Sequence, residues 1–295
     1  MGIIDVHNHT PRYRVAPEAG DVSQAMNSLW RPDQSASTAH TWEQHLKALE
    51  GIERAICFNI ASDPRLGEPD DGNLIYPARI ANDDTAAFVH AYPEKFIGFL
   101  TIHPFDPDPL GEIERATQEL GLRGIKLGPN YQNFDPLGPE AFRVFKRAEE
   151  LGLPILFHQG TSPVRFADLD FAHPRHIDRV ATAFPDLKMI LAHLGHPWQV
   201  DCCVVIRKHP NVYADLSANF YRPWAYYNAF RAATEWNVWH KVLFGSDYPI
   251  VTPQETIDAL WRVNDILEGT KLPPVPIGEL EKVLERNSLE LLGLE

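Results

Sequence analysis

The sequence is poor in cysteine, with only three among its 295 residues. Cys57 lies in an apolar run and is expected to pack as a small core residue. The adjacent Cys202 and Cys203 lack the Cys-x-x-Cys spacing that is typical of a zinc knuckle or a redox motif. We therefore expect reduced thiols and a cytoplasmic protein.

Long apolar runs and basic blocks are also missing. No run approaches the length of a membrane span, and the first residues show neither the basic nor the apolar region of a signal peptide. The formal net charge is −13, and no basic block offsets it. This balance disfavours nucleic acid as a partner, so we expect neither a nucleic-acid nor a membrane partner.

The sequence does contain a regular alternation of two kinds of segment. Eight short runs rich in β-branched or aromatic residues alternate with eight helical patterns, which predicts a parallel sheet. A chain of this length suits one α/β domain over 1–295, a closed (β/α)8 TIM barrel. An open doubly wound sheet is the alternative, but no Gly-x-Gly-x-x-Gly follows the first strand.

The expected boundaries follow from the same alternation. Strands are expected at 3–10, 54–60, 96–103, 124–127, 154–158, 188–193, 212–217 and 242–247. Helices are expected at 41–51, 78–91, 110–120, 139–151, 173–183, 199–208, 223–236 and 253–267. An extra C-terminal helix is expected over 277–292, packed outside the barrel.

Two histidines of the first expected strand suggest a metal site. Side chains alternate along a strand, so His7 and His9 point to the same face and can bind one divalent ion such as zinc. His-x-His also occurs in loops and in hydrogen-bonded cores. The metal interpretation gains support because His158, His193 and Asp247 each end another strand-like run. Strand ends meet at the catalytic rim of a barrel.

Other polar residues fall at or beyond the same strand ends. Lys126 can bind a substrate carboxylate, and His103 belongs either to the pocket wall or to a loop. His196 lies past a strand end, where it can reach substrate or only cap a helix. Loops on this side carry several arginines, which favours an anionic substrate despite the acidic total charge: Arg12, Arg14, Arg31, Arg165 and Arg222.

The remaining histidines lie on expected helices or at their ends. We expect these side chains at the surface: His40, His45, His90, His173, His176, His209 and His240.

Five ordered segments resemble the amidohydrolase superfamily, in particular the amidohydrolase-2 group related to aminocarboxymuconate semialdehyde decarboxylase. They are Asp5-Val-His-Asn-His, Gly124-Ile-Lys-Leu-Gly-Pro, Leu156-Phe-His-Gln-Gly, Leu191-Ala-His-Leu-Gly-His-Pro-Trp and Leu243-Phe-Gly-Ser-Asp-Tyr-Pro. The closing Asn287-Ser-Leu-Glu-Leu-Leu-Gly-Leu is also similar to the end of that group. The resemblance covers nearly the whole chain and implies a metal-dependent barrel.

Carried onto this sequence, the resemblance implies that His7, His9, His158 and Asp247 bind one divalent metal ion, with zinc expected and manganese as the alternative. His193 would be a catalytic acid or base, and Asp247 would share the catalytic work. Other branches of the superfamily hold a second ion on a carboxylated lysine. Lys126 stands near that position, but here we expect an ordinary ammonium that binds substrate, together with His103, His196 and Arg165.

This machinery suits hydrolysis of a small, anionic lactone, amide or ester by a metal-activated water. The runner-up is a metal-dependent non-oxidative decarboxylase of an aromatic or unsaturated acid, and a third possibility is a metal-binding barrel without catalysis. We expect a small molecule as the partner. The substrate's identity and whether the chain forms homo-oligomers are left open.

Overall fold

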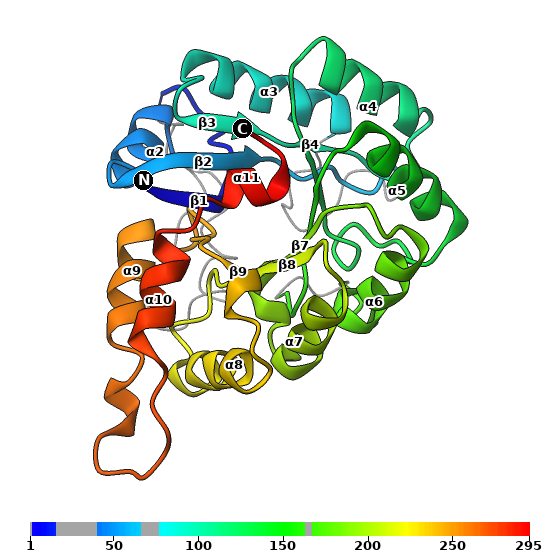
Figure 1. The fold of residues 1–295 in the computed structure, drawn as a ribbon. Helices are drawn as coiled ribbons and strands as arrows, with labels where there is room; N and C mark the ends of the chain where they lie inside the picture. The colour runs from blue at the N-terminus through cyan, green and yellow to red at the C-terminus, as the bar shows by residue number, and fades with distance from the viewer. Residues whose placement is uncertain (1, 16–39, 66–76, 163–166) are drawn as a thin grey trace.

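The computed structural model describes residues 2–15, 40–65, 77–162 and 167–295, and its strands form a closed parallel barrel (Figure 1). One sheet has the order β1-β2-β3, and the other has the order β4-β5-β6-β7-β8-β9. The strands are β1 (Ile3–His9), β2 (Ile52–Phe58), β3 (Phe96–Gly98), β4 (Leu100–Thr101), β5 (Ile125–Leu127), β6 (Ile155–Phe157), β7 (Met189–Leu191), β8 (Val212–Asp215) and β9 (Val242–Leu243).

The two sheets join at Phe99. Its backbone N–H donates to Cys57 of β2, and the next N–H, of Leu100, donates across to Gly124 (both 2.8 Å). β3 and β4 therefore occupy one barrel position, where a single strand over 96–103 was expected. Gly98 sits at this break, and a Cβ there would lie 2.4 Å from the side chain of Leu122. The chain changes partner where only glycine allows this close packing.

The barrel closes between the first strand and the segment after the last. The N–H of Val6 donates to Phe244 (3.0 Å), and the N–H of His9 donates to Tyr248 (2.8 Å). In return, the N–H of Asp247 donates to the carbonyl of His7 (2.8 Å). With β3 and β4 counted together, this gives the expected (β/α)8 barrel rather than an open sheet.

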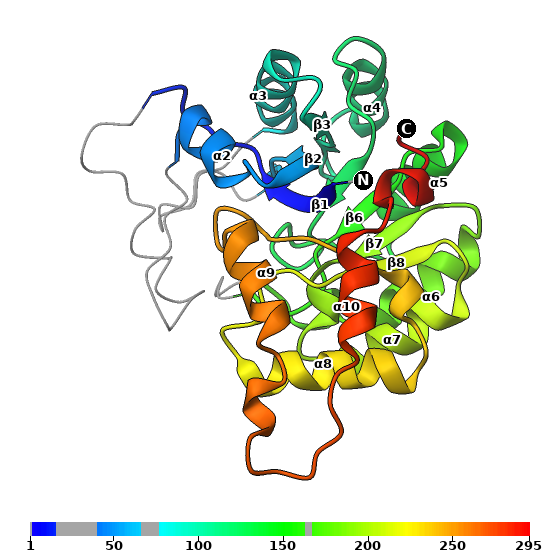
Figure 2. The same cartoon turned by 60° about the vertical axis from the view of Figure 1, so that its left-hand side comes forward.

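Helices surround the barrel (Figures 1 and 2). No helix of the described residues is long and apolar enough to cross a membrane. The helices are α2 (Trp42–Ala48), α3 (Ala78–Ala91), α4 (Pro109–Gln118), α5 (Pro139–Leu151), α6 (Pro174–Ala183), α7 (Gln199–Lys208), α8 (Pro223–Glu235), α9 (Pro253–Trp261), α10 (Ile277–Leu284) and α11 (Ser288–Leu292), with short 3-10 turns at η1 (Asp170–Ala172), η2 (Ala192–Gly195), η3 (Trp239–Lys241) and η4 (Asp265–Leu267).

Alternate strand residues face two different cores. In β6, Ile155 and Phe157 pack outward against the helices, whereas Leu156 packs inside the barrel. The same alternation in β5 sends Ile125 and Leu127 outward. It therefore directs Lys126, which lies between them, into the barrel.

The C-terminal segment differs from the expected single outer helix. The chain forms two helices, and Asn287 begins the second by accepting a hydrogen bond from the N–H of Glu290. α10 lies outside the barrel beside α9 in both views (Figures 1 and 2). α11 instead places Leu289 and Leu292 in the interior cluster with Ile4 of β1, so it covers the end where the strands begin. The expected helix 253–267 also ends early, at Trp261.

Candidate metal centre

The two histidines of β1 lie on one side of the strand, as their spacing predicts. Nε2 of His7 lies 3.1 Å from Oδ1 of Asp247, and Nε2 of His9 lies 3.0 Å from the same oxygen. Both imidazoles also meet the ring of Phe58, at the end of β2, with centroids 5.2 and 5.0 Å apart. Neighbouring strands thus fix both rings before any ligand is added.

Asp247 lies four residues beyond the end of β9, not on the strand as expected. Its φ of 69° is left-handed, a conformation that aspartate tolerates better than most residues. This turn carries the carboxylate back over β1. Buried Asp5 helps to hold the two segments together, since one of its oxygens accepts the N–H groups of His7 (3.1 Å) and Ser246 (3.0 Å).

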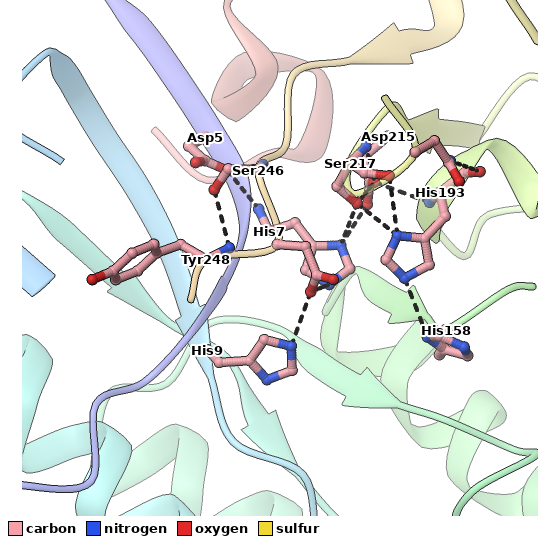
Figure 3. Close-up of polar contacts among 11 residues, drawn as sticks. Asp5, His7, His9, His158, His193, Asp215, Ser217, Ser246 and Tyr248 are labelled. Carbon is pink, nitrogen blue, oxygen red and sulfur yellow. Dashed lines mark hydrogen bonds and ion pairs between the residues drawn. The ribbon is translucent and has the colours of Figure 1, made fainter. Parts of the chain in front are cut away.

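His193 also lies just past its strand. β7 ends at Leu191, and His193 and Leu194 have φ of 59° and 48° within η2, which takes them out of the strand ladder. Nδ1 of His193 lies 2.8 Å from the hydroxyl of Ser217. On its other side, Nε2 lies 3.3 Å from Nδ1 of His158, so the ring stands between these two residues (Figure 3).

Lys126 and His158 each carry a buried atom without a hydrogen bond. The Lys126 ammonium lies 4.6 Å from the centroid of Phe58, and its Nζ has no hydrogen-bond partner among the described residues. Nε2 of His158 likewise has no partner within the described part of the chain, although its ring packs against Tyr131 at 4.7 Å. Such atoms cost free energy unless a ligand satisfies them.

The described residues include one group of three or more His, Cys, Asp or Glu with donor atoms close enough for a metal: His7, His193 and Asp247, all within 4.8 Å of one another. His9 joins this group through Asp247, and His158 joins it through His193. Imidazole nitrogens with one carboxylate are a donor set that zinc and its neighbours accept. Together with the orphaned His158 nitrogen, the set fits a divalent ion.

The electrostatics of the centre come from burial and from close opposite charges. Burial opposes ionisation of Asp247, but the charge and hydrogen bond of His7 and the hydrogen bond of His9 hold its pKa well below the usual value. Burial lowers the pKa of His193 to about 4 and that of Lys126 to about 7. For His7, burial and Lys126 act to lower the pKa, but Asp215 and Asp247 outweigh them and raise it.

The other expected substrate residues are less close to this group. His103 is fully buried, with Nε2 against the carbonyl of Gln132 (2.5 Å) and Nδ1 accepting the N–H of Phe105 (3.1 Å). Both ring nitrogens are therefore used by the loops after β4 and β5, which argues against a direct substrate contact. His196 follows η2 and pairs through Nδ1 with Gln199 (3.0 Å). Arg165 lies outside the described residues.

Two expectations need correction or addition. His45 is fully buried, and His40 and His176 are nearly so, although all three were expected at the surface. His45 stacks on His40 beneath Tyr248, and burial lowers its pKa well below the usual value. Asp215 and Ser217 were assigned no role from the sequence, yet both contact the centre. Their position at the end of β8 was the available signal.

The family model described as "Amidohydrolase", in the amidohydrolase-2 group, matches residues 61–294. The chain belongs to this family. The match covers most of the chain, including the segments that carry His158, His193 and Asp247.

Curated relatives match over shorter stretches. A dihydroorotase from Helicobacter pylori (strain G27) is 34% identical over 115 residues, which is 37% of this chain and 32% of that protein. A 2-amino-3-carboxymuconate-6-semialdehyde decarboxylase from Dictyostelium discoideum is 32% identical over 83 residues, 28% of this chain and 23% of that protein. The chain thus spans about a third or less of the length of these relatives, and it is related to proteins of both names.

Solved structures match along the whole chain. An uncharacterised TIM-barrel protein from Bordetella bronchiseptica has a TM-score of 0.73 at 22% identity and covers 100% of this chain and 99% of its own. A dihydroxybenzoic acid decarboxylase from Polaromonas sp. JS666, with bound manganese and the inhibitor 2-nitroresorcinol, has a TM-score of 0.67 at 18% identity and covers 99% and 97%. At such identities these neighbours support the TIM-barrel fold alone.

Proposed function

We propose that this chain is a metal-dependent hydrolase of a small, anionic lactone, amide or ester. The observation that carries the proposal is Oδ1 of Asp247, which lies within 3.1 Å of the Nε2 atoms of both His7 and His9. A carboxylate in that position can bind an ion and also accept a proton beside it. Water attack needs such a proton acceptor.

One divalent ion is proposed, held by His7, His9, His158 and Asp247, with zinc expected and manganese as the alternative. When bound, such an ion supplies Lewis-acid polarisation of a carbonyl and of water. Asp247 then accepts the proton of the attacking water and passes it to the leaving group. The His193 ring lies with its centroid 5.0 Å from that of His7, and it orients the substrate carbonyl or delivers a proton.

The preference for an anion rests on Lys126. Its ammonium is buried, points into the barrel and has no hydrogen-bond partner in the ranges that the structure describes. A substrate carboxylate would supply the missing partner and, as an opposite charge, would favour the charged form of the lysine. The net charge of −13 is a sum over the whole chain and does not set the charge next to one buried side chain.

A decarboxylase of an aromatic or unsaturated acid is the second candidate. One of the two curated relatives described above is named as a decarboxylase, and a neighbour with that activity in its name shares the fold over nearly the whole chain. Lys126 suits this reaction equally well, since its substrate is also a carboxylate. We also propose a cytoplasmic location, with which the three buried, free cysteines are compatible.

The first experiment is metal analysis of the purified protein, where we expect about one zinc or manganese per chain. The double variant His7→Ala/His9→Ala should lose that ion, and metal retained at full stoichiometry would contradict the proposed ligands. A screen of lactones, amides, esters and unsaturated acids, with carbon dioxide and hydrolysis product measured in parallel, separates the two reactions. Metal binding with no turnover would instead support a non-catalytic role.

A further inference from the structure

The end of β8 and the segment after it present Asp215, Ser217 and Asn219 to His193, and the proposed reaction uses none of these three. Oδ1 of Asp215 accepts the backbone N–H of His193 at 3.0 Å. The amide of Asn219 donates to the carbonyl of His193 at 2.8 Å. The left-handed backbone of His193 is thus held at its N–H and at its carbonyl by two residues four positions apart.

The ring of His193 is held by the same segment. The Ser217 hydroxyl donates to Oδ1 of Asp215 at 2.5 Å, so its single proton is already used. Toward Nδ1 of His193, 2.8 Å away, the hydroxyl can then offer only a lone pair. The carbonyl of Ser217 lies 3.3 Å from the same nitrogen and also only accepts. Nδ1 must therefore carry the proton, which leaves Nε2 unprotonated and facing Nδ1 of His158 at 3.3 Å.

His7 meets the other oxygen of the same carboxylate. Its Nδ1 donates to Oδ2 of Asp215 at 2.8 Å, in a contact where both side chains are buried. His7 therefore keeps a proton on Nδ1, and its Nε2 faces Oδ1 of Asp247 at 3.1 Å. The Asp215 carboxylate thus determines the position of the ring proton in two histidines, in His7 directly and in His193 through Ser217.

We propose that Asp215 is the positioning residue that sets the ring tautomers of His7 and His193, with Ser217 as its relay to His193. Both rings then turn Nε2 toward the centre, that of His7 to Asp247 and that of His193 to His158. This inference deepens the proposed function and rests on it wherever zinc binding is the readout. Hydrogen bonds of this kind commonly orient metal-binding histidines and strengthen them as ligands.

The first test is Asp215→Asn, which preserves the shape of the side chain. The amide oxygen can keep accepting from His193 and Ser217, so the new NH2 group faces Nδ1 of His7 and donates to it. His7 must then carry its proton on Nε2, toward Asp247. We expect zinc affinity, measured by competition with a chromophoric chelator, to fall roughly 10–100-fold. Wild-type affinity in a folded variant would overturn the role of Asp215.

The second test examines Ser217 in metal-free protein and needs no activity. Nitrogen-15 NMR of the His193 ring, assigned by its loss in His193→Asn, should show the Nδ1–H tautomer in the wild type. Ser217→Ala removes the closer acceptor at 2.8 Å and keeps only the backbone carbonyl at 3.3 Å, so it should give a mixture of both tautomers. Ser217→Thr, which keeps the hydroxyl, should restore the single form. The matched control is Ser288→Ala, since Ser288 is buried with an unpartnered hydroxyl away from the centre. An unchanged Nδ1–H tautomer in Ser217→Ala would overturn the relay.

The two proposals fail in different ways. If the wild type shows the Nδ1–H tautomer but binds no zinc, the proposed function is contradicted and the positioning of His193 is still supported. If the wild type binds zinc and turns over substrate, but the His193 tautomer is the same in Ser217→Ala, the positioning role is contradicted and the proposed function is still supported. If Asp215→Asn loses its fold by circular dichroism, the Ser217 variants alone decide the inference.

Discussion

At the scale of single residues, Lys126 combines full burial with an Nζ that no described residue hydrogen-bonds. We predict that Lys126→Met, which keeps most of the volume, lowers kcat/KM by about 10–150-fold. The reason is that a hydrogen bond to a charged group contributes roughly 1.5–3 kcal/mol. Metal content, measured by atomic emission, should stay at the wild-type value. A fall in metal per chain would instead identify Lys126 as a metal-bridging residue.

Substitution of His193 and of Asp247 should affect activity and metal binding differently. Both have a positive φ, which asparagine tolerates, so His193→Asn and Asp247→Asn should keep the backbone. A general acid or base contributes typically 10²–10⁴-fold, and we predict a loss of that order in kcat for His193→Asn with metal retained. Asp247→Asn should cost at least as much and should also weaken metal binding, because a charged ligand is lost.

Activity and metal content of the two purified variants decide this division of roles. If His193→Asn loses its metal while Asp247→Asn keeps full activity, the assignments are reversed. The three-residue group of His7, His193 and Asp247 makes the comparison worthwhile, since it places His193 as close to the centre as the expected ligands.

At the scale of elements, Gly160 joins the loops that follow β6 and β7. Its φ is +119°, and a Cβ there would lie 2.4 Å from the carbonyl oxygen of His196. The next N–H, of Thr161, donates to that same carbonyl (2.9 Å). Gly160→Ala should therefore push the two loops apart and move His158, which lies two residues earlier.

The predicted cost of Gly160→Ala is about 1–3 kcal/mol of unfolding free energy, the usual range for a residue held in a disfavoured conformation. Urea denaturation of the metal-free protein measures it. Gly152→Ala is a matched control, because Gly152 also has a positive φ (66°) but nothing lies within 4 Å of its Cβ position. An equal loss in both variants would mean that the loop contact adds nothing beyond backbone strain.

At the scale of the whole molecule, buried histidines set the response to acid. Burial lowers the pKa of His193 from 6.5 to about 4, and it also lowers those of His45 and His158. Below pH 6.5 the unfolded chain takes up protons that these folded side chains resist, so stability falls as pH falls. His7 opposes this trend, because its pKa is raised in the folded state.

We therefore predict that the urea midpoint of the metal-free protein is lower at pH 5 than at pH 7. Chemical denaturation followed by tryptophan fluorescence measures both midpoints. His45→Phe, which removes a buried titrating ring outside the metal centre, should reduce the difference. An equal or higher midpoint at pH 5 would show that the raised pKa of His7 dominates.

The sequence by itself determined the barrel and most of the elements that build it. Alternating apolar strands and amphipathic helices are local patterns, and a parallel sheet of eight such units has few ways to close. The spacing of His7 and His9 likewise predicted one shared face, since side-chain direction alternates along any strand. The buried, interior direction of Lys126 follows from the same rule, because Ile125 and Leu127 face outward.

Tertiary structure alone decided how the centre is assembled. His193 and Asp247 reach it from left-handed turns beyond their strands, a geometry that depends on partners distant in the sequence. Asp215 contacts His7 across 208 positions of the chain, a pairing that no local pattern encodes. Local sequence also does not predict the burial of His45, which lies on a helix of mostly polar sequence. His40, Phe88 and Tyr248 pack against its ring and bury it. Local rules fix where side chains point along an element, whereas closure of the barrel fixes which of them meet.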